Sequence, residues 1–130
     1  MNKSRFLIVA TTFLLSCQPK KIEQDPKRAQ VLLSEGMGIL YTRIDIQDED
    51  RSKAARLNDS AILKFSQSYR TDTTLFDAAF YASECTMFKR DYHSCLEWTT
   101  KVLALDTTQK NREFCNERIA HCKSQLNGLH

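Results

Sequence analysis

Residues 75–108 read LFDAAFYASECTMFKRDYHSCLEWTTKVLALDTT, and this stretch decides the fold. Small side chains recur at Ala79 and Ala82, at positions where one helix would contact an antiparallel neighbour. A short polar break at Arg90-Asp91 interrupts the apolar pattern, which then resumes with helical spacing. The stretch therefore predicts two antiparallel helices joined by a tight turn.

The same stretch resembles a tetratricopeptide repeat, a helix-turn-helix unit of about 34 residues. The resemblance rests on the small residues of the first helix, the aromatic Tyr92 after the turn and the closing Leu105-Asp106. Ser83 stands where the family usually has glycine, and Thr107 where it usually has proline. The resemblance implies an all-α fold of antiparallel helix-turn-helix pairs, about two repeats followed by a C-terminal capping helix. It also implies a binding scaffold.

Helix start and stop signals divide the rest of the chain into helices. An Asp before a Pro suits a first helical turn, and Thr or Asp before an apolar run suits an N-cap. The first predicted helix begins after Asp25-Pro26, and the second runs from about Ala54 to Asp72-Thr73. The third runs from an N-cap box of Thr74 and Asp77 to Lys89, and the fourth from Tyr92, capped by Asp91, to Leu105. The fifth runs from a Thr108 cap to about Gln125.

The first half of the chain is longer than a repeat requires. Two segments resemble the two helices of a repeat: Met37-Gly38-Ile39-Leu40-Tyr41, and Ala61-Ile62 with Phe65. They are about eleven residues further apart than in a repeat of the family, which is close to three helical turns. We therefore expect both helices to be extended and to meet at the acidic segment 45–51. Calcium is an alternative role for that segment, but the glycine and spacing of a calcium loop are absent. Gly38 is expected to allow close approach of a neighbouring helix, or else to be a tolerated glycine.

The composition fits one small helical domain. The 130 residues are 42% hydrophobic and 27% charged, with three glycines and two prolines. Lys3 and Arg5 lie in a predicted signal peptide, and without them the formal charge falls from +3 to +1. Because the remaining Lys and Arg are interspersed with Asp and Glu, no nucleic-acid partner is expected.

The amino terminus carries the pattern of an exported protein. A short basic start precedes an apolar run at 6–15, too short for a membrane span but typical of a secretory signal. The run ends in Leu14-Leu15-Ser16-Cys17, which resembles the bacterial lipoprotein cleavage box. The resemblance implies a signal peptide at 1–16 and lipidation of Cys17, followed by a polar tether to residue 27 and a helical domain at 28–130. Since Gln18 is not aspartate, we expect an envelope location at the outer membrane, facing the periplasm. An ordinary signal peptide is the alternative.

Four cysteines follow the lipidated one. In an oxidising compartment they allow one or two disulfides or remain free buried thiols. A bridge from Cys85 or Cys95 to Cys115 or Cys122 is favoured, because the capping helix should lie beside both helices of the second repeat. Zinc held by these cysteines with histidines is the other alternative, but the usual ligand spacing is absent, so no metal or cofactor is expected. No catalytic signature occurs, and an enzyme is not expected.

The expected partner surface is the concave face that the first helix of each repeat lines in the family. Carried over by position, it includes Leu32, Glu35, Ile39 and Arg43 in the first helix, Asp77, Phe80, Glu84, Met87 and Phe88 in the third, and Asn111, Phe114, Arg118 and His121 in the capping helix. Phe80 and Phe114 form either the floor of a groove or ordinary packing between helices. The sequence thus predicts a lipid-anchored scaffold that binds an envelope protein or peptide through this face. The alternative is an assembly subunit of an envelope complex or a homo-oligomer, and a less favoured one is a small envelope enzyme or metal-binding protein.

Overall fold

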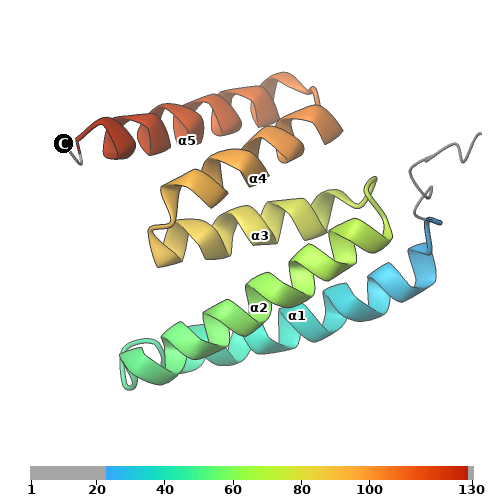
Figure 1. The fold of residues 1–130 in the computed structure, drawn as a ribbon, viewed down its shortest axis with the longest axis vertical. Helices are drawn as coiled ribbons and strands as arrows, with labels where there is room; N and C mark the ends of the chain where they lie inside the picture. Colours follow the sequence, from blue (N-terminus) through green and yellow to red (C-terminus); the bar gives the residue numbers. More distant parts are fainter. Residues whose placement is uncertain (1–22, 129–130) are drawn as a thin grey trace, which may run out of the picture.

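The computed structural model describes residues 23–128, which form five α-helices and no strand (Figure 1). The predicted signal peptide and Cys17 lie outside the described residues. Successive helices pack side by side as antiparallel neighbours. The helices are α1 (Pro26–Ile46), α2 (Arg51–Thr71), α3 (Phe76–Lys89), α4 (Tyr92–Leu105) and α5 (Gln109–Asn127). This arrangement confirms the predicted all-α fold of antiparallel helix-turn-helix pairs. Helix α1 begins two residues before the predicted domain boundary at residue 28.

Side-chain caps fix most of the helix starts. Asp25 accepts a hydrogen bond from the backbone N–H of Arg28 at 3.1 Å, and Asp91 accepts one from Ser94 at 3.2 Å. The Thr108 hydroxyl accepts one at 3.4 Å from Asn111 N–H at the start of α5. These bonds satisfy N–H groups that have no partner within the helix. The three caps expected from the sequence are therefore present.

The expected cap of α3 is wrong. Helix α3 begins at Phe76 with Leu75 as its N-cap residue, and no side chain bonds to the first turn. Thr74 instead donates to Asp72, through its backbone N–H at 3.0 Å and its hydroxyl at 2.6 Å. Asp72 thus forms a tight polar turn that takes the Thr74 hydroxyl away from the helix.

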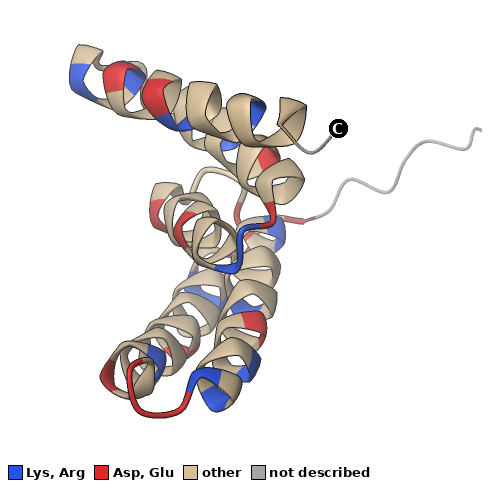
Figure 2. Cartoon of the chain, turned by 90° about the vertical axis from the view of Figure 1, so that its left-hand side faces the viewer, with Lys and Arg blue, Asp and Glu red and all other residues tan. Residues whose placement is uncertain are grey.

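The first helix pair is longer than the second, as the extra residues predicted. Helices α1 and α2 have 21 residues each, whereas α3 and α4 have 14. A turn at 47–50 joins the long pair, and the backbone N–H groups of Glu49 and Asp50 both donate to Ile46 O. Asp50 also caps α2 through Lys53 N–H at 2.9 Å. The acidic tip, residues 48–50, therefore has a structural role in reversing the chain, and it shows as the red loop in Figure 2.

A glycine does permit a close contact between α1 and α2, but it is Gly36 rather than Gly38. A Cβ on Gly36 would lie 2.7 Å from Cε1 of Phe65, too close for any side chain. Gly38 is exposed, and a Cβ there would meet nothing within 4 Å. Of the two expectations for Gly38, close approach of a neighbouring helix is wrong and a tolerated glycine is confirmed, because no atom packs where its Cβ would lie.

The core lies on both sides of α3. One cluster joins α1, α2 and α3 through Leu33, Leu40, Ala61, Phe65, Ala78, Ala82 and Cys85. A second cluster joins Ala79 of α3 to Val102 of α4 and Cys115 of α5. The alanines of α3 are fully buried, so their small size lets helices approach α3 from two sides. Helix α3 is therefore the central element of the fold.

The entering chain is attached to the turn between α2 and α3. The Gln24 Oε1 atom accepts from the backbone N–H of Thr73 at 2.7 Å and from its hydroxyl at 3.2 Å. The backbone N–H of Asp25 donates to Thr71 O at 2.9 Å. These bonds join the start of α1 to the end of α2. None of the helices in residues 23–128 is long and apolar enough to cross a membrane.

Candidate functional site

Aromatic side chains from α3 and α5 meet on the face that the sequence assigned to a partner. The ring centroids of Phe80 and Phe114 are 5.9 Å apart, and Phe76 stacks on Phe80 at 5.8 Å. Tyr81 contacts Phe80 edge-on at 5.3 Å. Phe80 and Phe114 also line a cavity of about 330 Å³ with Asp106, Thr108, Lys110 and Asn111. The two phenylalanines therefore fit both alternatives, because they pack against each other between helices and also line an open, mainly apolar cavity.

Arg118 joins α5 to α3 beside this cavity. Its guanidinium pairs with Glu84 at 2.6 Å (Nη2 to Oε1) and donates to the Ser83 hydroxyl at 2.7 Å. It also lies over the ring of Phe114, 4.6 Å from the centroid. The Arg118 side chain is only 12% exposed, so its donors are used within the fold. Arg118 and Glu84, expected as partner contacts, thus form the wall that positions Phe114.

A second arginine on the same side of α3 lacks such partners. Arg43 of α1 is buried, and its guanidinium lies 3.9 Å from the ring centroid of Phe88. Its Nε has no acceptor, and no ion pair among residues 23–128 involves it. Burial lowers the pKa of Arg43, although Cys85 and Glu84 act in the opposite direction. Phe88 itself is 43% exposed, so an arginine–phenylalanine stack reaches the surface here.

Other predicted site residues lie elsewhere or serve the fold. The Asn111 amide donates to Asp106 O at 2.6 Å and to Val102 O at 3.4 Å, which satisfies carbonyls at the end of α4. His121 contacts Tyr92 edge-on at 5.9 Å, at the contact between α4 and α5. Glu35 pairs with Lys64 of α2 at 2.6 Å.

The remaining predicted residues differ in their exposure. Asp77 is exposed, and Met87 is partly buried. Leu32 is buried, and Ile39 packs against the first core cluster. The structure therefore brings together Phe80, Phe114, Glu84 and Arg118, and it places Phe88 with Arg43.

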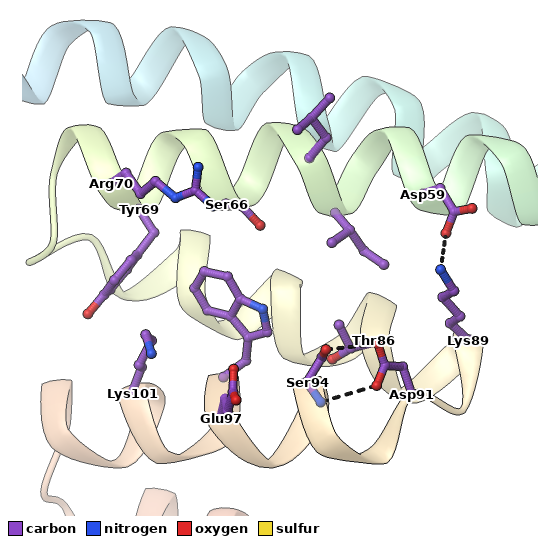
Figure 3. Close-up of a pocket in the computed structure, with 13 residues that line it drawn as sticks. Asp59, Ser66, Tyr69, Arg70, Thr86, Lys89, Asp91, Ser94, Glu97 and Lys101 are labelled. Atoms are coloured by element: carbon purple, nitrogen blue, oxygen red, sulfur yellow. Dashed lines mark hydrogen bonds and ion pairs between the residues drawn. The ribbon is translucent and has the colours of Figure 1, made fainter.

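A further cavity is one that the sequence did not predict. It occupies about 620 Å³ between α2 and α4, with Thr86 and Lys89 of α3 contributing to it (Figure 3). Trp98 of α4 is one of the residues that line it. Tyr69 meets the Trp98 ring edge-on at 5.4 Å, and the Lys101 ammonium lies 5.5 Å from its centroid. An ion pair of Lys89 with Asp59 at 2.9 Å lies at one end of the groove.

The four cysteines of the described chain are free thiols, all buried. The Cys115 thiol donates to Asn111 Oδ1 at 3.7 Å, and the Cys95 thiol donates to Ser83 O at 3.6 Å. Cys95 is a neighbour of Cys122 and contributes to raising the pKa of its thiol. Burial raises the pKa of Cys85 to about 11 and is also the main cause that raises the pKa of Cys122 to about 11. Buried neutral thiols of this kind are poor nucleophiles.

No metal centre is evident within the described part of the chain, since no three His, Cys, Asp or Glu residues gather there as ligands could. Comparisons of the chain with protein-family models, curated proteins and solved structures gave no significant match. The site therefore rests on its own geometry.

Sequence reasoning missed two features of these surfaces. It placed Arg43 on the concave face but did not anticipate its stacking on Phe88, which depends on contact between α1 and α3. It treated Trp98 only as part of a helix pattern, whereas the groove around it requires α2 and α4 to stand on either side of α3. The one available signal was Trp98 itself, the only tryptophan in the chain.

Proposed function

We propose that the chain is a lipid-anchored, tetratricopeptide-like scaffold of the bacterial envelope, and that it binds a protein or peptide through the face formed by α1, α3 and α5. The observation that carries this proposal is the aromatic cluster of Phe80 and Phe114 beside an open cavity. Aromatic and arginine side chains dominate the binding energy of protein interfaces. Both kinds are present on this face, held by packed helices.

The surface is suited to binding because its side chains are already positioned. Phe114 is fixed between Phe80 and the guanidinium of Arg118, and Arg118 is fixed by Glu84 and Ser83. A partner would therefore pay little entropy to order the floor of the cavity. Phe88 and the stacked Arg43 extend the same surface toward the acidic tip with an exposed ring and a cation that has no ion-pair partner among the described residues.

The anchor is supported by the sequence alone. A basic start, an apolar run and Leu14-Leu15-Ser16-Cys17 suit export followed by acylation of Cys17. Several acyl chains hold a protein at a membrane far more firmly than one, since each buried methylene adds about 0.8 kcal/mol. The intact mass of the protein purified from membranes tests this part. A chain that still begins at Met1 and carries no acyl groups would contradict it.

Photo-cross-linking in intact envelopes tests the binding face. A photoreactive phenylalanine analogue replaces Phe88 in the full-length chain, and a matched variant carries it in place of Val31, which is 58% exposed on α1. We expect a discrete adduct from position 88 and none from position 31. Equal adducts from both positions, or none from position 88, would contradict the proposal.

An assembly subunit is the second candidate function. Of the large apolar side chains that are exposed, Val31, Tyr41 and Ile44 all lie on the long helix α1. Exposed apolar groups on an extended helix suit packing against another subunit. Sedimentation of the full chain over a range of concentrations tests self-association. A sedimentation coefficient that does not change with concentration would rule out a homo-oligomer.

A further inference from the structure

Helices α4 and α5 pack in an antiparallel register that two contacts define. Near the start of α4, the ring of Tyr92 lies against His121 in the last part of α5. At the other end, the Asn111 amide reaches Val102 O. Moving along α4 from Tyr92 toward Val102 therefore means moving along α5 from His121 toward Asn111. Cys95, one turn into α4, consequently falls opposite the later turns of α5, where Cys122 lies.

The thiols of Cys95 and Cys122 meet in this contact. Both side chains are 0% exposed, and Cys95 is close enough to Cys122 to help raise the pKa of its thiol. The Cys95 thiol also lies 3.6 Å from Ser83 O and 3.8 Å from the Thr99 hydroxyl, so polar groups surround the sulfur on its own side. The pair is therefore held between helices.

The other two cysteines have different neighbours. Cys115 bonds to Asn111 Oδ1 of its own helix. Cys85 of α3 lies near Arg43, and its carbonyl accepts from the Asn58 amide of α2. The structure thus selects one pairing among those that the sequence left open.

We infer that Cys95 and Cys122 form a disulfide that fixes α5 to α4, while Cys85 and Cys115 remain thiols. The reaction is exchange with an oxidised disulfide such as glutathione disulfide. One cysteine thiolate attacks the oxidant, releases one glutathione and leaves a mixed disulfide; the second thiolate then attacks the protein sulfur and releases the other glutathione. Two electrons and two protons pass from the cysteine pair to the oxidant.

The bridge has a structural consequence for α5. As the last helix, α5 packs mainly on α4, and it contributes Phe114 and Arg118 to the surface described above. A covalent link between residues 95 and 122 closes a loop that contains the turn between the helices and most of both helices. Such a link restricts the unfolded chain and prevents α5 from separating alone.

The burial of the pair determines when it can react. Burial is the main cause that raises the pKa of the Cys122 thiol to about 11, so very little thiolate exists in the folded protein near neutral pH. Oxidation must therefore take place before α5 docks, or when it separates briefly. The folded, reduced protein should resist oxidation, whereas the refolding chain should form the bridge.

Refolding in a glutathione redox buffer tests the pairing. The reduced full-length chain is refolded with oxidised glutathione, free thiols are blocked with N-ethylmaleimide, and the protein is digested with trypsin without reduction. Lys and Arg place Cys17 in peptide 6–20 and the other four cysteines in separate peptides: 71–89, 91–101, 113–118 and 119–123. We expect peptide 91–101 to be joined to 119–123, with the other two alkylated. Complete alkylation of all four, or a bridge to 71–89 or 113–118, would overturn the inference.

Thermal unfolding provides an independent measurement. The oxidised protein should melt at least roughly 10 °C above the same protein kept in dithiothreitol, given the length of the closed loop. Cys122→Ala should abolish this redox dependence of Tm. Cys115→Ala is the matched control, because Cys115 is also fully buried on α5, and it should keep the redox dependence. A redox shift that survives Cys122→Ala would overturn the inference.

Discussion

Replacing Gly36 by alanine perturbs a close contact between α1 and α2. The new Cβ would lie 2.7 Å from Cε1 and 2.9 Å from Cδ1 of Phe65. The Phe65 side chain is fully buried and stacks on Tyr81 at a centroid distance of 5.6 Å, so its ring has no solvent to move into. Gly38 provides the matched control on the same helix, since a Cβ there meets nothing within 4 Å.

The two substitutions share one favourable effect and differ in one cost. Replacing a helical glycine by alanine stabilises a protein by about 0.8–1 kcal/mol through helix propensity. Gly38→Ala should keep that gain. Gly36→Ala should also incur an overpacking cost of about 1–3 kcal/mol, because a close-packed core cannot absorb an added methyl group. The free energy of unfolding should therefore differ by about 1–3 kcal/mol between the variants, with Gly38→Ala the more stable.

Urea unfolding followed by far-UV circular dichroism measures both values against the wild-type protein. The m-value checks that each variant unfolds from an equally compact state, so that changes in midpoint report stability. Thermal melts should rank the variants in the same order. Equal stabilisation by both alanines would mean that α1 and α2 separate easily at Gly36, which would refute the packing argument.

Three further predictions concern polar groups. Arg118→Met should reduce the free energy of unfolding by about 1–2 kcal/mol, whereas Arg43→Met should change it by under about 1 kcal/mol. The reason is that Arg118 loses an ion pair, while Nε of Arg43 has no acceptor and no ion pair among residues 23–128 involves Arg43. Equal losses in urea titrations would contradict this. Burial raises the pKa of Cys85 from 9.0 to about 11. The free energy of unfolding of the reduced protein should therefore fall by about 1–3 kcal/mol as pH rises through that range. The fall in this free energy between pH 8 and 11 should be smaller for Cys85→Ala. Asp72→Ala should reduce the free energy of unfolding by about 1–2 kcal/mol, and Thr74→Ala should reduce it less, since Asp72 accepts both hydrogen bonds from Thr74. A lower Tm for Thr74→Ala than for Asp72→Ala would contradict the role of Asp72 in that turn.

Local signals made much of the fold predictable. An Asp before Pro26, Asp91 after a polar break and Thr108 before the last helix each act on the backbone within three residues, so their effect can be read without a tertiary structure. The extended first pair followed from counting residues between matching segments. These features depend on neighbours along the chain.

Features that depend on distant residues were missed. Which glycine faces a neighbouring helix depends on the rotation of α1 against Phe65, and the sequence pattern did not separate Gly36 from Gly38. The groove at Trp98 requires two helices that are separated by a third. At Thr74, a competing hydrogen bond to Asp72 removed a cap that the residue pattern favoured. Long-range packing and competition between polar partners therefore limited the prediction of the site.

The hydrogen bonds of Gln24 and Asp25 to the turn between α2 and α3 determine how the domain would respond to mechanical load. Tension applied through the preceding chain reaches these bonds to Thr71 and Thr73 before it can stretch α1. The force is thereby transmitted to the turn that precedes the central helix α3, rather than to α1 alone. A tethered domain attached in this way resists peeling of α1 by sharing the force with the middle of the molecule.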